Sequence, residues 1–441
     1  MASRRSGATL RFLCRMISAA AAWLGATSAG AAAAAPGTLD SGGTAWVLTA
    51  SALVLFMTLP GLALFYGGLV RARNLLSVLM HCFVIGCVVS LLWLAFGYSL
   101  VFQPGSGVIG SLQGAFLTGI RDRLSPNGVP EGAIALFQMT FAVITPALII
   151  GAFTERVRFG FVILFSALWL VLVYLPVAHW VWGGGWLASG GTIDFAGGIV
   201  VHTTAGVSAL IAALVVGPRA GFPHHLEPPH SPGMTMAGAG MLWIGWFGFN
   251  GGSALAADAS AASAILATHF AAAAAGLAWI AAEKLRLGKP TSVGIVTGCV
   301  AGLATITPAS GYVGAWGAAI IGAAGGLVCF FATSFVKGRL KIDDSLDVFA
   351  VHGIGGMLGS LLVAAFALPA LGGSGFGHDL SGLQQLGAQA LGIAAAAVWS
   401  VVCTFVIVKL LAATVGVRVS LEEQREGLDL STHGERAYDY A

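Results

Sequence analysis

Apolar segments of membrane-spanning length dominate this chain. Eleven of them follow one another, each close to the roughly 20 residues that a helix needs to cross the hydrocarbon of a bilayer. We expect these segments at 45–70, 75–102, 132–153, 159–178, 197–216, 233–253, 259–282, 291–308, 314–336, 347–369 and 385–412. The sequence therefore predicts an all-α integral membrane protein with eleven transmembrane helices.

The composition supports this interpretation. Of the 441 residues, 57% are hydrophobic and 9% are charged, and the mean hydropathy is +0.89. Soluble domains average about 25% charged residues, so this chain has too few to cover a water-exposed globule. The 63 glycines suit helices that pack closely through small faces. No basic tract indicates nucleic-acid binding, and the spacing of the six cysteines fits neither a disulfide framework nor a zinc site.

The distribution of positive charge predicts the orientation. The loops after the first, third, fifth, seventh and ninth segments contain eleven Lys and Arg residues, whereas the alternate loops contain only Arg121 and Arg123. The eleven are Arg71, Arg73, Arg156, Arg158, Arg219, Lys284, Arg286, Lys289, Lys337, Arg339 and Lys341. Because cytoplasmic loops are enriched in Lys and Arg, we expect the mature N-terminus outside and the C-terminus in the cytoplasm.

The first 35 residues have the layout of a secretory signal. Four arginines precede a short apolar stretch, which ends in an Ala-rich run with a cleavage site expected between Ala29 and Ala35. The alternative is an uncleaved first transmembrane helix. We therefore expect a signal peptide at 1–35, one membrane domain at 36–412 and a cytoplasmic tail at 413–441.

A short pattern occurs twice, in the fifth and the tenth segments. Each copy has an Asp eight residues before a His, a Val directly before that His and a Gly four residues after it. The copies are Asp194, Val201, His202 and Gly206, and Asp344, Val351, His352 and Gly356. Five segments that start outside end inside, so the next five form an inverted repeat, and the eleventh segment lies outside the symmetry. Inverted repeats place a substrate site near the midplane, so we expect the two histidines to meet there.

Histidine is expensive at membrane depth and usually marks a polar or proton-handling pathway. A neutral imidazole offers one donor and one acceptor, so two facing rings can share a proton and accept from a small N–H molecule. Two imidazolium ions would repel, so the pair holds at most one extra proton. His81, His179 and His269 also lie in or beside apolar segments, but they have no partner in the repeat, and we interpret them as structural.

Aromatic residues gather near one predicted end of the pathway. Phe137 and Phe141 share a helical face, Trp182 precedes the fifth segment, and the sixth contains Trp246 and later Ser253. Interfacial tryptophans are also ordinary membrane anchors. Aromatic faces attract weakly hydrated cations by about 0.5–2 kcal/mol each, so such rings with a hydroxyl suit a small monovalent cation. No carboxylate lies well inside a segment, and we expect no metal site, no cofactor and no enzymatic activity.

Several motifs in order resemble the Amt-type ammonium transporters of the Amt/Rh family. The resemblance extends over nearly the whole chain, from the first segment to the tail. The motifs are Asp-Phe-Ala-Gly-Gly to Gly-Pro-Arg at 194–219, Phe-Gln-x-x-Phe-Ala at 137–142, Ala-His-x-Val-Trp-Gly-Gly-Gly at 178–185, Gly-Trp-Phe-Gly-Phe-Asn at 245–250, Thr-Pro-Ala-x-Gly-Tyr at 307–312 and Asp-Asp-x-x-Asp-Val-Phe-x-Val-His-Gly at 343–353.

The resemblance implies roles for particular residues. Phe141 and Phe249 would be a stacked gate, and Trp182, Phe141 and Ser253 would form the outer ammonium-binding site. His202 and His352 would line the pore as a twin-histidine pair. Four residues would support the recruitment site: Asp194, Phe137, Trp246 and Thr307. For Asp194 we favour an N-cap and loop-ordering role over direct ligation, because it precedes a helix start.

One departure from the family pattern lies inside the gate motif, where Met139 and Thr140 stand in place of the smaller residues of many members. Trp182 and the cytoplasmic tail favour the Amt branch over the Rh branch. The resemblance also implies a homotrimer with one pore in each protomer. Glu-Gly-Leu-Asp and His-Gly-Glu motifs in the tail resemble the part of the family that meets PII-type signal proteins.

The function implied by the resemblance is selective ammonium uptake across a bacterial inner membrane, with methylammonium as an analogue. The ammonium ion would bind at the aromatic site and lose its proton. Ammonia would then pass the histidines, with or without that proton. Two alternatives stay open, namely an ammonium sensor that signals through its tail and a channel for neutral gases or urea, as in the Rh branch.

Overall fold

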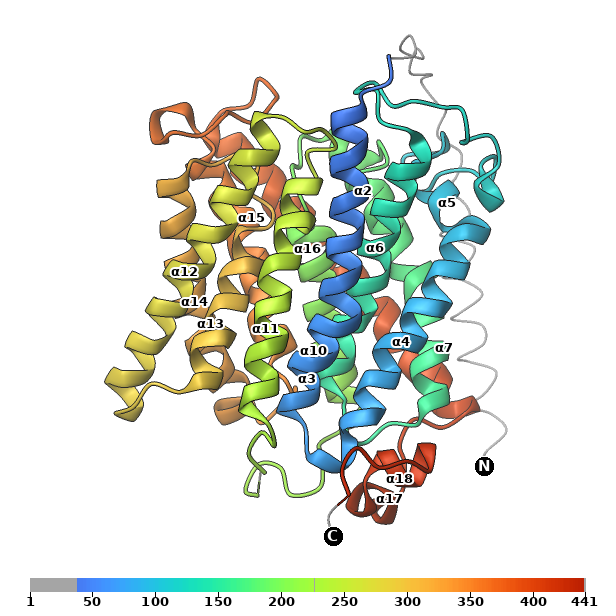
Figure 1. Ribbon diagram of the computed structural model, residues 1–441, viewed down its shortest axis with the longest axis vertical. Coiled ribbons are helices and arrows are strands. Elements are labelled where there is room, and N and C mark those ends of the chain that lie inside the picture. The colour runs from blue at the N-terminus through green and yellow to red at the C-terminus, as the bar shows by residue number, and fades with distance from the viewer. Residues whose placement is uncertain (1–37, 226, 440–441) are drawn as a thin grey trace, which may run out of the picture.

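The computed structural model describes residues 38–225 and 227–439 as a bundle of long helices that run roughly side by side (Figure 1). Within these ranges the structure has helices, three isolated β-bridges and no strand. The signal peptide predicted at 1–35 lies outside the described residues.

The first five predicted segments coincide with helices, several of which contain a short 3-10 or π-helical turn labelled η. In chain order, the elements of this half are α2 (Ser41–Phe56), η1 (Met57–Leu62), α3 (Ala63–Leu69), η2 (Ala72–Asn74), α4 (Leu75–Leu92), η3 (Trp93–Gly97), α5 (Tyr98–Phe102), η4 (Ala115–Leu117), α6 (Glu131–Ile149), η5 (Ile150–Ala152), α7 (Phe159–Trp169), η6 (Leu170–Tyr174), α8 (Leu175–Val181), α9 (Trp186–Ser189), η7 (Gly198–Thr203) and α10 (Thr204–Val216).

The other six predicted segments and the tail are helical as well. The elements are α11 (Pro232–Trp246), η8 (Phe247–Gly251), α12 (Ala259–Leu287), α13 (Ser292–Ile306), α14 (Ala315–Ser334), η9 (Phe335–Arg339), η10 (Phe349–Ile354), α15 (Gly355–Phe366), η11 (Pro369–Leu371), α16 (Gly382–Thr414), α17 (Leu421–Glu426) and α18 (Leu428–His433).

Nine helical segments in the described ranges are long and apolar enough to cross a membrane. The other two predicted segments, 233–253 and 291–308, correspond to the 15-residue helices α11 and α13, the first of which continues into η8. Every predicted segment is thus helical, and the number of eleven membrane crossings stays a prediction.

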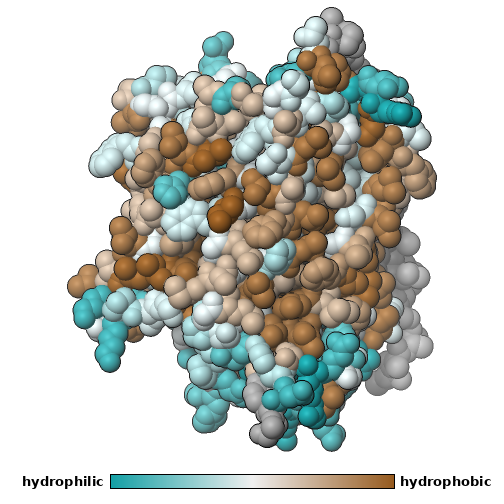
Figure 2. Space-filling view, in the orientation of Figure 1, coloured by the Kyte–Doolittle hydropathy of each residue, from teal (hydrophilic) through white to brown (hydrophobic). Residues whose placement is uncertain are grey.

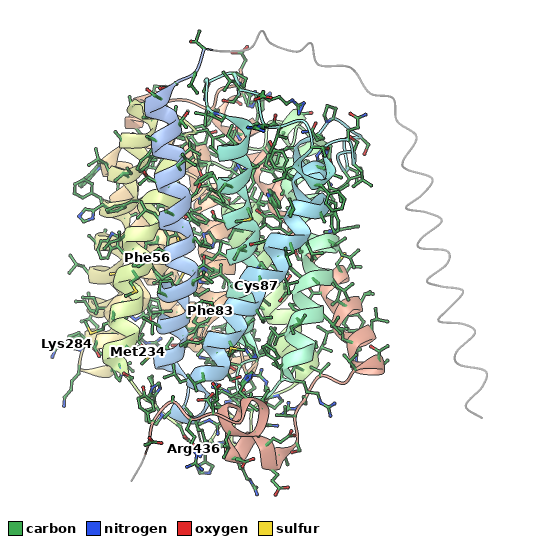
Figure 3. The ribbon with its side chains drawn as sticks, turned by 45° about the vertical axis from the view of Figure 1, so that its right-hand side comes forward. Phe56, Phe83, Cys87, Met234, Lys284 and Arg436 are labelled. Atoms are coloured by element: carbon green, nitrogen blue, oxygen red, sulfur yellow. The ribbon has the colours of Figure 1, made fainter. Side chains whose placement is uncertain are left out.

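The surface has the pattern expected of a membrane protein. Hydrophobic side chains cover the middle of the visible face, and hydrophilic ones gather towards the two ends (Figure 2). Phe56 and Phe83, which are 41% and 51% exposed, lie at mid-height, whereas Lys284 lies somewhat lower and Arg436 lies near the lower end (Figure 3). A band of apolar side chains facing outwards is stable against lipid and not against water.

Helix pairings recur between the two halves of the chain. Helix α2 packs on α6 as α11 packs on α13, α4 packs on α7 as α12 packs on α14, and α6 packs on α10 as α13 packs on α15. The halves also meet reciprocally, since α10 packs on η10 and α15 packs on η7. The pattern that occurs twice in the sequence therefore belongs to two similar packing units.

The C-terminal tail packs back onto the bundle through hydrogen bonds at the N-terminus of α4. The Asp429 carboxylate of α18 accepts hydrogen bonds from the backbone N–H groups of Leu76 (3.1 Å) and Ser77 (2.8 Å) at the start of α4. The backbone N–H of Leu428 donates to Oδ1 of Asn74 at 2.8 Å. A carboxylate at a helix N-terminus stabilises the free N–H groups there, so these contacts hold the tail against α4.

Candidate functional site

The two histidines that the sequence repeat pairs lie in contact at the centre of the bundle. Nδ1 of His352 is 3.2 Å from Nδ1 of His202, and the ring centroids are 5.2 Å apart at an interplanar angle of 19°. The side chains come from η10 and η7 and are 4% and 1% exposed. One Nδ1 must donate and the other accept, so the neutral pair is left with one Nε2 acceptor and one Nε2–H donor.

Two glycines let the histidine helices approach this closely. A Cβ added to Gly206 would overlap the backbone of Gly353, and one added to Gly356 would lie 2.6 Å from Cβ of His202. Each glycine, four residues after its own histidine, thus packs against the histidine helix of the other half. The glycines of the repeat have a mutual packing role, which allows the backbones to come close.

The two histidine segments also share a wide helical turn, a feature that several other helices of the bundle have as well. His202 and His352 lie in π-helical turns, which continue as the α-helices α10 and α15. A π-helical turn is rare and occurs mostly as a single-turn bulge, frequently at a functional site. The repeat is therefore retained in backbone geometry as well as in residue type.

The aspartates of the repeat cap these turns, but unequally. The Asp194 carboxylate accepts four backbone hydrogen bonds of 2.7–3.0 Å, from the N–H groups of residues 197 to 200. Asp344 accepts one from the N–H of Phe349 at 2.7 Å, and its buried Oδ1 has no hydrogen-bond partner. Burial and the nearby charge of Asp347 raise the pKa of Asp344 to about 6.

A small apolar cavity adjoins the histidine pair. It measures about 10 Å³, close to what one water-sized molecule needs. Nε2 of His202 is buried and has no hydrogen-bond partner in the structure. The lining residues are Met57, Leu62, Phe65, Ile144, Leu148, Val201, His202, Leu242, Trp246, Phe249, Val300 and His352. The imidazoles are therefore the main polar groups of a narrow, otherwise largely apolar passage.

Stacked rings close one side of this passage. The rings of Phe141 and Phe249 are stacked at 4.1 Å and 27°, and both are fully buried. The ring of Trp182 meets Phe141 edge-on at 5.8 Å and 88°, and its Nε1–H donates to the carbonyl of Asp194 at 2.8 Å. Ser253 is half-buried, and its hydroxyl donates to the carbonyl of Phe249 at 2.9 Å.

Phe137 and Trp246, two of the residues predicted to support the recruitment site, contact Phe141 and His202. The ring of Phe137 lies 5.0 Å from that of Phe141. Trp246 stacks on His202 at 5.6 Å and 21°, and its Nε1–H donates to Oγ1 of Thr307 at 2.9 Å. Because the Trp246 indole stacks on His202 and is itself held by Thr307, it restricts the orientation of the His202 ring.

A larger cavity of about 220 Å³ opens on the other side of the histidines. Its wall includes His352 together with charged and polar side chains that are absent from the narrow passage. These include Arg219, Glu227, Lys337, Ser345 and Asp347. The passage therefore connects an aromatic side with a polar, charged side.

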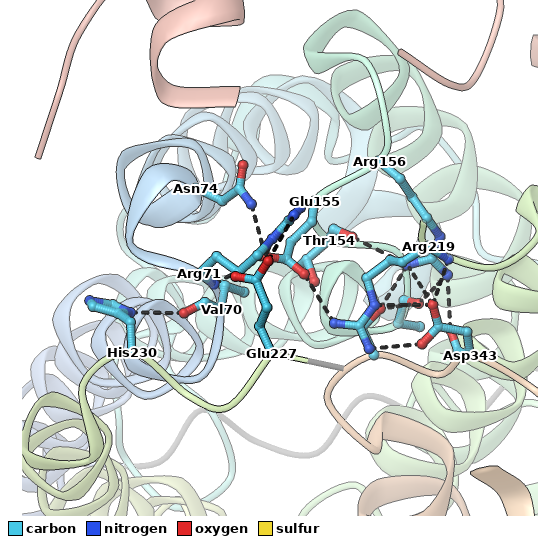
Figure 4. A network of polar contacts seen from close by, with 12 residues as sticks. Val70, Arg71, Asn74, Thr154, Glu155, Arg156, Arg219, Glu227, His230 and Asp343 are labelled. Carbon is cyan, nitrogen blue, oxygen red and sulfur yellow. Dashed lines mark hydrogen bonds and ion pairs between the residues drawn. The ribbon is translucent and has the colours of Figure 1, made fainter. Parts of the chain in front are cut away.

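An ion-pair network lies at the same end of the bundle (Figure 4). Glu155 pairs with Arg71 at 2.7 Å and with Arg219 at 3.0 Å, and Arg219 also pairs with Asp343 at 2.8 Å. Asn74 donates to Glu155 at 2.8 Å. Burial acts to raise the pKa of Glu155, but the charges of Arg219 and Arg71 outweigh it and hold the pKa at about 2. Sequence reasoning used these arginines for orientation alone and missed the carboxylates between them.

The three histidines interpreted as structural lie away from the pair. His179 has both ring nitrogens within hydrogen-bond distance of backbone carbonyls, at 2.7 and 2.8 Å. His81 stacks on Phe159 at 5.9 Å, and the exposed His269 packs against Trp243 at 5.4 Å. In the part of the chain that the structure describes, no three His, Cys, Asp or Glu side chains converge to hold a metal ion.

Comparison with known proteins places this geometry in a family. Residues 45–438 match the model of the Ammonium Transporter Family. A putative ammonium transporter of Methanothermobacter thermautotrophicus is 47% identical over 409 residues, which cover 91% of this chain and 99% of that protein. An ammonium transporter of Aquifex aeolicus is 47% identical over 405 residues, which cover 91% of this chain and 94% of that one.

Solved structures of similar proteins have the same fold. A protein described as a sensor Amt protein superposes with a TM-score of 0.83 at 32% identity, over 89% of this chain and 98% of its own. Mep2 of Saccharomyces cerevisiae superposes with a TM-score of 0.79 at 36% identity, over 87% of this chain and 91% of its own. With a family match over most of its length and these relatives, the chain belongs to the Ammonium Transporter Family, a family of membrane transporters.

Proposed function

We propose that this protein takes up ammonium selectively, by passing ammonia along the histidine pair with or without the proton. The observation that carries the proposal is the contact between His202 and His352 inside a passage that is narrow, apolar and buried. Membership of a family whose relatives are named ammonium transporters supports the substrate. The chemistry of conduction follows from the groups along the passage.

Recruitment takes place at the aromatic side. Trp182, Phe141 and Ser253 form the outer site, where ring faces attract a monovalent cation and the hydroxyl accepts a hydrogen bond from it. Asp194 acts through the loop that it caps, because all four of its hydrogen bonds are to backbone N–H groups. The role of Asp194 is to hold the start of the pore helix.

The stacked pair of Phe141 and Phe249 is the gate. Rings 4.1 Å apart leave no space between them, so one ring must turn for a molecule to pass. Met139 and Thr140 lie between Phe137 and Phe141 on α6, and the Thr140 hydroxyl donates to the Phe137 carbonyl at 2.6 Å. Thr140 is thereby satisfied within its own helix and adds no polar group to the gate.

Selectivity arises because a bare cation is strongly disfavoured in the dry passage. Ammonium can lose a proton and continue as ammonia, whereas potassium cannot. The Nε2 acceptor and the Nε2–H donor of the neutral pair match the hydrogens and the lone pair of ammonia. The pair holds at most one extra proton, because two adjacent imidazolium ions repel.

The proposed topology is eleven transmembrane helices, with an inverted repeat of five plus five and one additional helix. The recurring helix pairings support the repeat, and the described chain begins and finishes at opposite ends of the bundle (Figure 1). Alternate loops rich in Lys and Arg support a cytoplasmic C-terminus. We place the protein in a bacterial inner membrane after cleavage of a signal peptide, as a homotrimer with a pore in each protomer.

The docked tail favours a second candidate function. It packs on α4 through Asp429, so a partner that binds the tail can act on the membrane helices. We propose a PII-type signal protein as that partner. Sensing of ammonium through the tail is the second candidate, and one of the solved relatives is described as a sensor.

Fluxes in proteoliposomes test the main proposal. The purified protein is reconstituted, and currents and radiolabelled methylammonium uptake are recorded across matched ammonium, potassium and pH gradients, with protein-free liposomes as the control. We expect a protein-dependent flux with ammonium, none with potassium, and methylammonium uptake that ammonium inhibits. Equal fluxes for potassium and ammonium, or no flux of either, would refute the proposal.

A further inference from the structure

The side-chain ammonium group of Lys337 lies in the wall of the polar cavity beyond the histidines. Nζ of Lys337, in η9, donates to the Asp347 carboxylate at 2.7 Å and to the Ser345 carbonyl at 3.1 Å. All three residues line the cavity of about 220 Å³ that also reaches His352. The Lys337 ammonium group thus donates hydrogen bonds to two oxygen acceptors in the wall of this cavity.

The acceptors are held in place by neighbouring structure, independently of the lysine. The backbone N–H of Ser345 donates to the carbonyl of Ala152, and its hydroxyl accepts from Arg156 at 2.7 Å. The carbonyl of Asp347 accepts from the N–H of Val351 at the start of the histidine turn. Removal of the lysine side chain would therefore leave the acceptors in position.

The site has acceptor capacity beyond what the lysine uses. Oδ1 of Asp347 is buried and has no hydrogen-bond partner in the structure, while Oδ2 accepts from Lys337. Asp347 also has a φ of +60°, a region that residues other than glycine adopt rarely. Backbone conformations of this kind persist where the surrounding structure imposes them, often at functional sites.

We propose that the carboxylate of Asp347 and the carbonyl of Ser345 form an inner cation site for ammonium and primary alkylammonium ions, and that Lys337 occupies it as a tethered competitor. The inference rests on the proposed function and specifies the release side of the pore. Lysine and ammonium share N–H donors and a positive charge, so the same acceptors bind both. The side chains of Lys337 and Asp347 are each 25% exposed, and ion pairs with such access to solvent are weak enough to exchange.

Competition by the lysine has a measurable consequence. A free ligand binds the site only while the lysine is away, so its apparent affinity is lowered in proportion to that fraction of time. The lysine therefore lowers the occupancy of the exit by cytoplasmic ammonium and favours release. Without it, ammonium on the cytoplasmic side should saturate the exit at lower concentrations.

The test uses the full chain in proteoliposomes with the tail facing the lumen. Vesicles with an accessible C-terminal affinity tag are removed by capture, and methylammonium uptake is measured against increasing lumenal ammonium. We expect Lys337→Gln to lower the half-inhibitory lumenal concentration by roughly fivefold. Lys337→Arg keeps the charge in place and should behave like the wild type. Arg339→Gln, which removes an exposed charge from the same helix end, is the matched control.

Three outcomes would overturn the inner site. They are no shift in Lys337→Gln, an equal shift in Arg339→Gln, and a Lys337→Gln variant with slower uptake but an unchanged half-inhibitory concentration, which indicates a structural lysine. Failure of the proposed function looks different, because the wild type itself would then show no methylammonium uptake that ammonium inhibits.

Discussion

The two sides of the histidine pair differ although the helices that carry it repeat. On the side of His202, Asp194 makes four backbone hydrogen bonds and stacked rings fill the passage. On the side of His352, Asp344 makes one such hydrogen bond and the passage widens into the charged cavity. The scaffold is therefore shared, and the side chains around it make one side tight and the other open.

In the proposed function, this asymmetry separates selection from release. The tight side orders a loop and a ring stack, where a cation can be recognised and stripped of water. The open side is lined by charged groups, and the proposal places the recombination of a proton with ammonia there. A repeat that was equally tight at both ends would bind the substrate and release it slowly, so the proposal assigns a separate task to each half.

Truncation of one ring on each side should show the largest difference. Phe249 is fully buried in the stack, and we expect Phe249→Ala to lower the free energy of unfolding by about 4 kcal/mol. Phe65 is buried and lines both the narrow passage and the open cavity, so Phe65→Ala enlarges an existing space and should lower the free energy of unfolding by about half as much. Unfolding in mixed detergent micelles measures both, and equal costs would remove the distinction between a packed and an open side.

The two capping aspartates should differ less, and in a pH-dependent way. Asp194→Asn replaces an oxygen that accepts hydrogen bonds from backbone N–H groups, and it should lower the free energy of unfolding by about 2 kcal/mol. Asp344→Asn can place its amide nitrogen where Oδ1 has no partner, so its cost at pH 5 should be less than about 1 kcal/mol. The unfolding midpoints of both variants measure the difference.

The pH dependence at Asp344 has a definite sign. Its pKa is about 6 in the folded protein, above the unfolded value near 3.9. The folded wild type is therefore favoured at low pH and loses stability as the pH rises from about 4 through 6, by at most about 3 kcal/mol. Asp344→Asn lacks this loss, so its stability relative to the wild type should rise over that range. A constant difference across pH 4.5–8 would contradict the buried, partly unsatisfied carboxylate.

Sequence reasoning reached the local and repeated features of this structure. Segment length and hydropathy predicted where the helices are, and the matched spacing around His202 and His352 singled out the two side chains that lie in contact. Position before a helix start was also enough to predict that Asp194 caps its turn. These features depend on residues close in the chain or on symmetry, which a sequence displays directly.

The features that the sequence did not predict depend on contacts between residues that are far apart in the chain. The π-helical turns are decided by packing between helices and leave no clear periodic signal. Glu155 lies 64 residues from Arg219, and Asp343 lies 124 residues from it, so loop composition showed the charges and not their pairing. Lys337 was read as an orientation signal alone, because the cavity beside it exists only in the folded bundle.

The central claim is that the contacting histidines carry ammonium selectively. The direct measurement compares ammonium and potassium currents in proteoliposomes for the wild type, His202→Ala, His352→Ala and the control His269→Ala, which alters an exposed histidine of α12. We predict that each pore variant loses selective ammonium flux or admits potassium, while the control retains both flux and selectivity. Wild-type ammonium flux with potassium still excluded, in either pore variant that folds as stably as the control, would contradict the account.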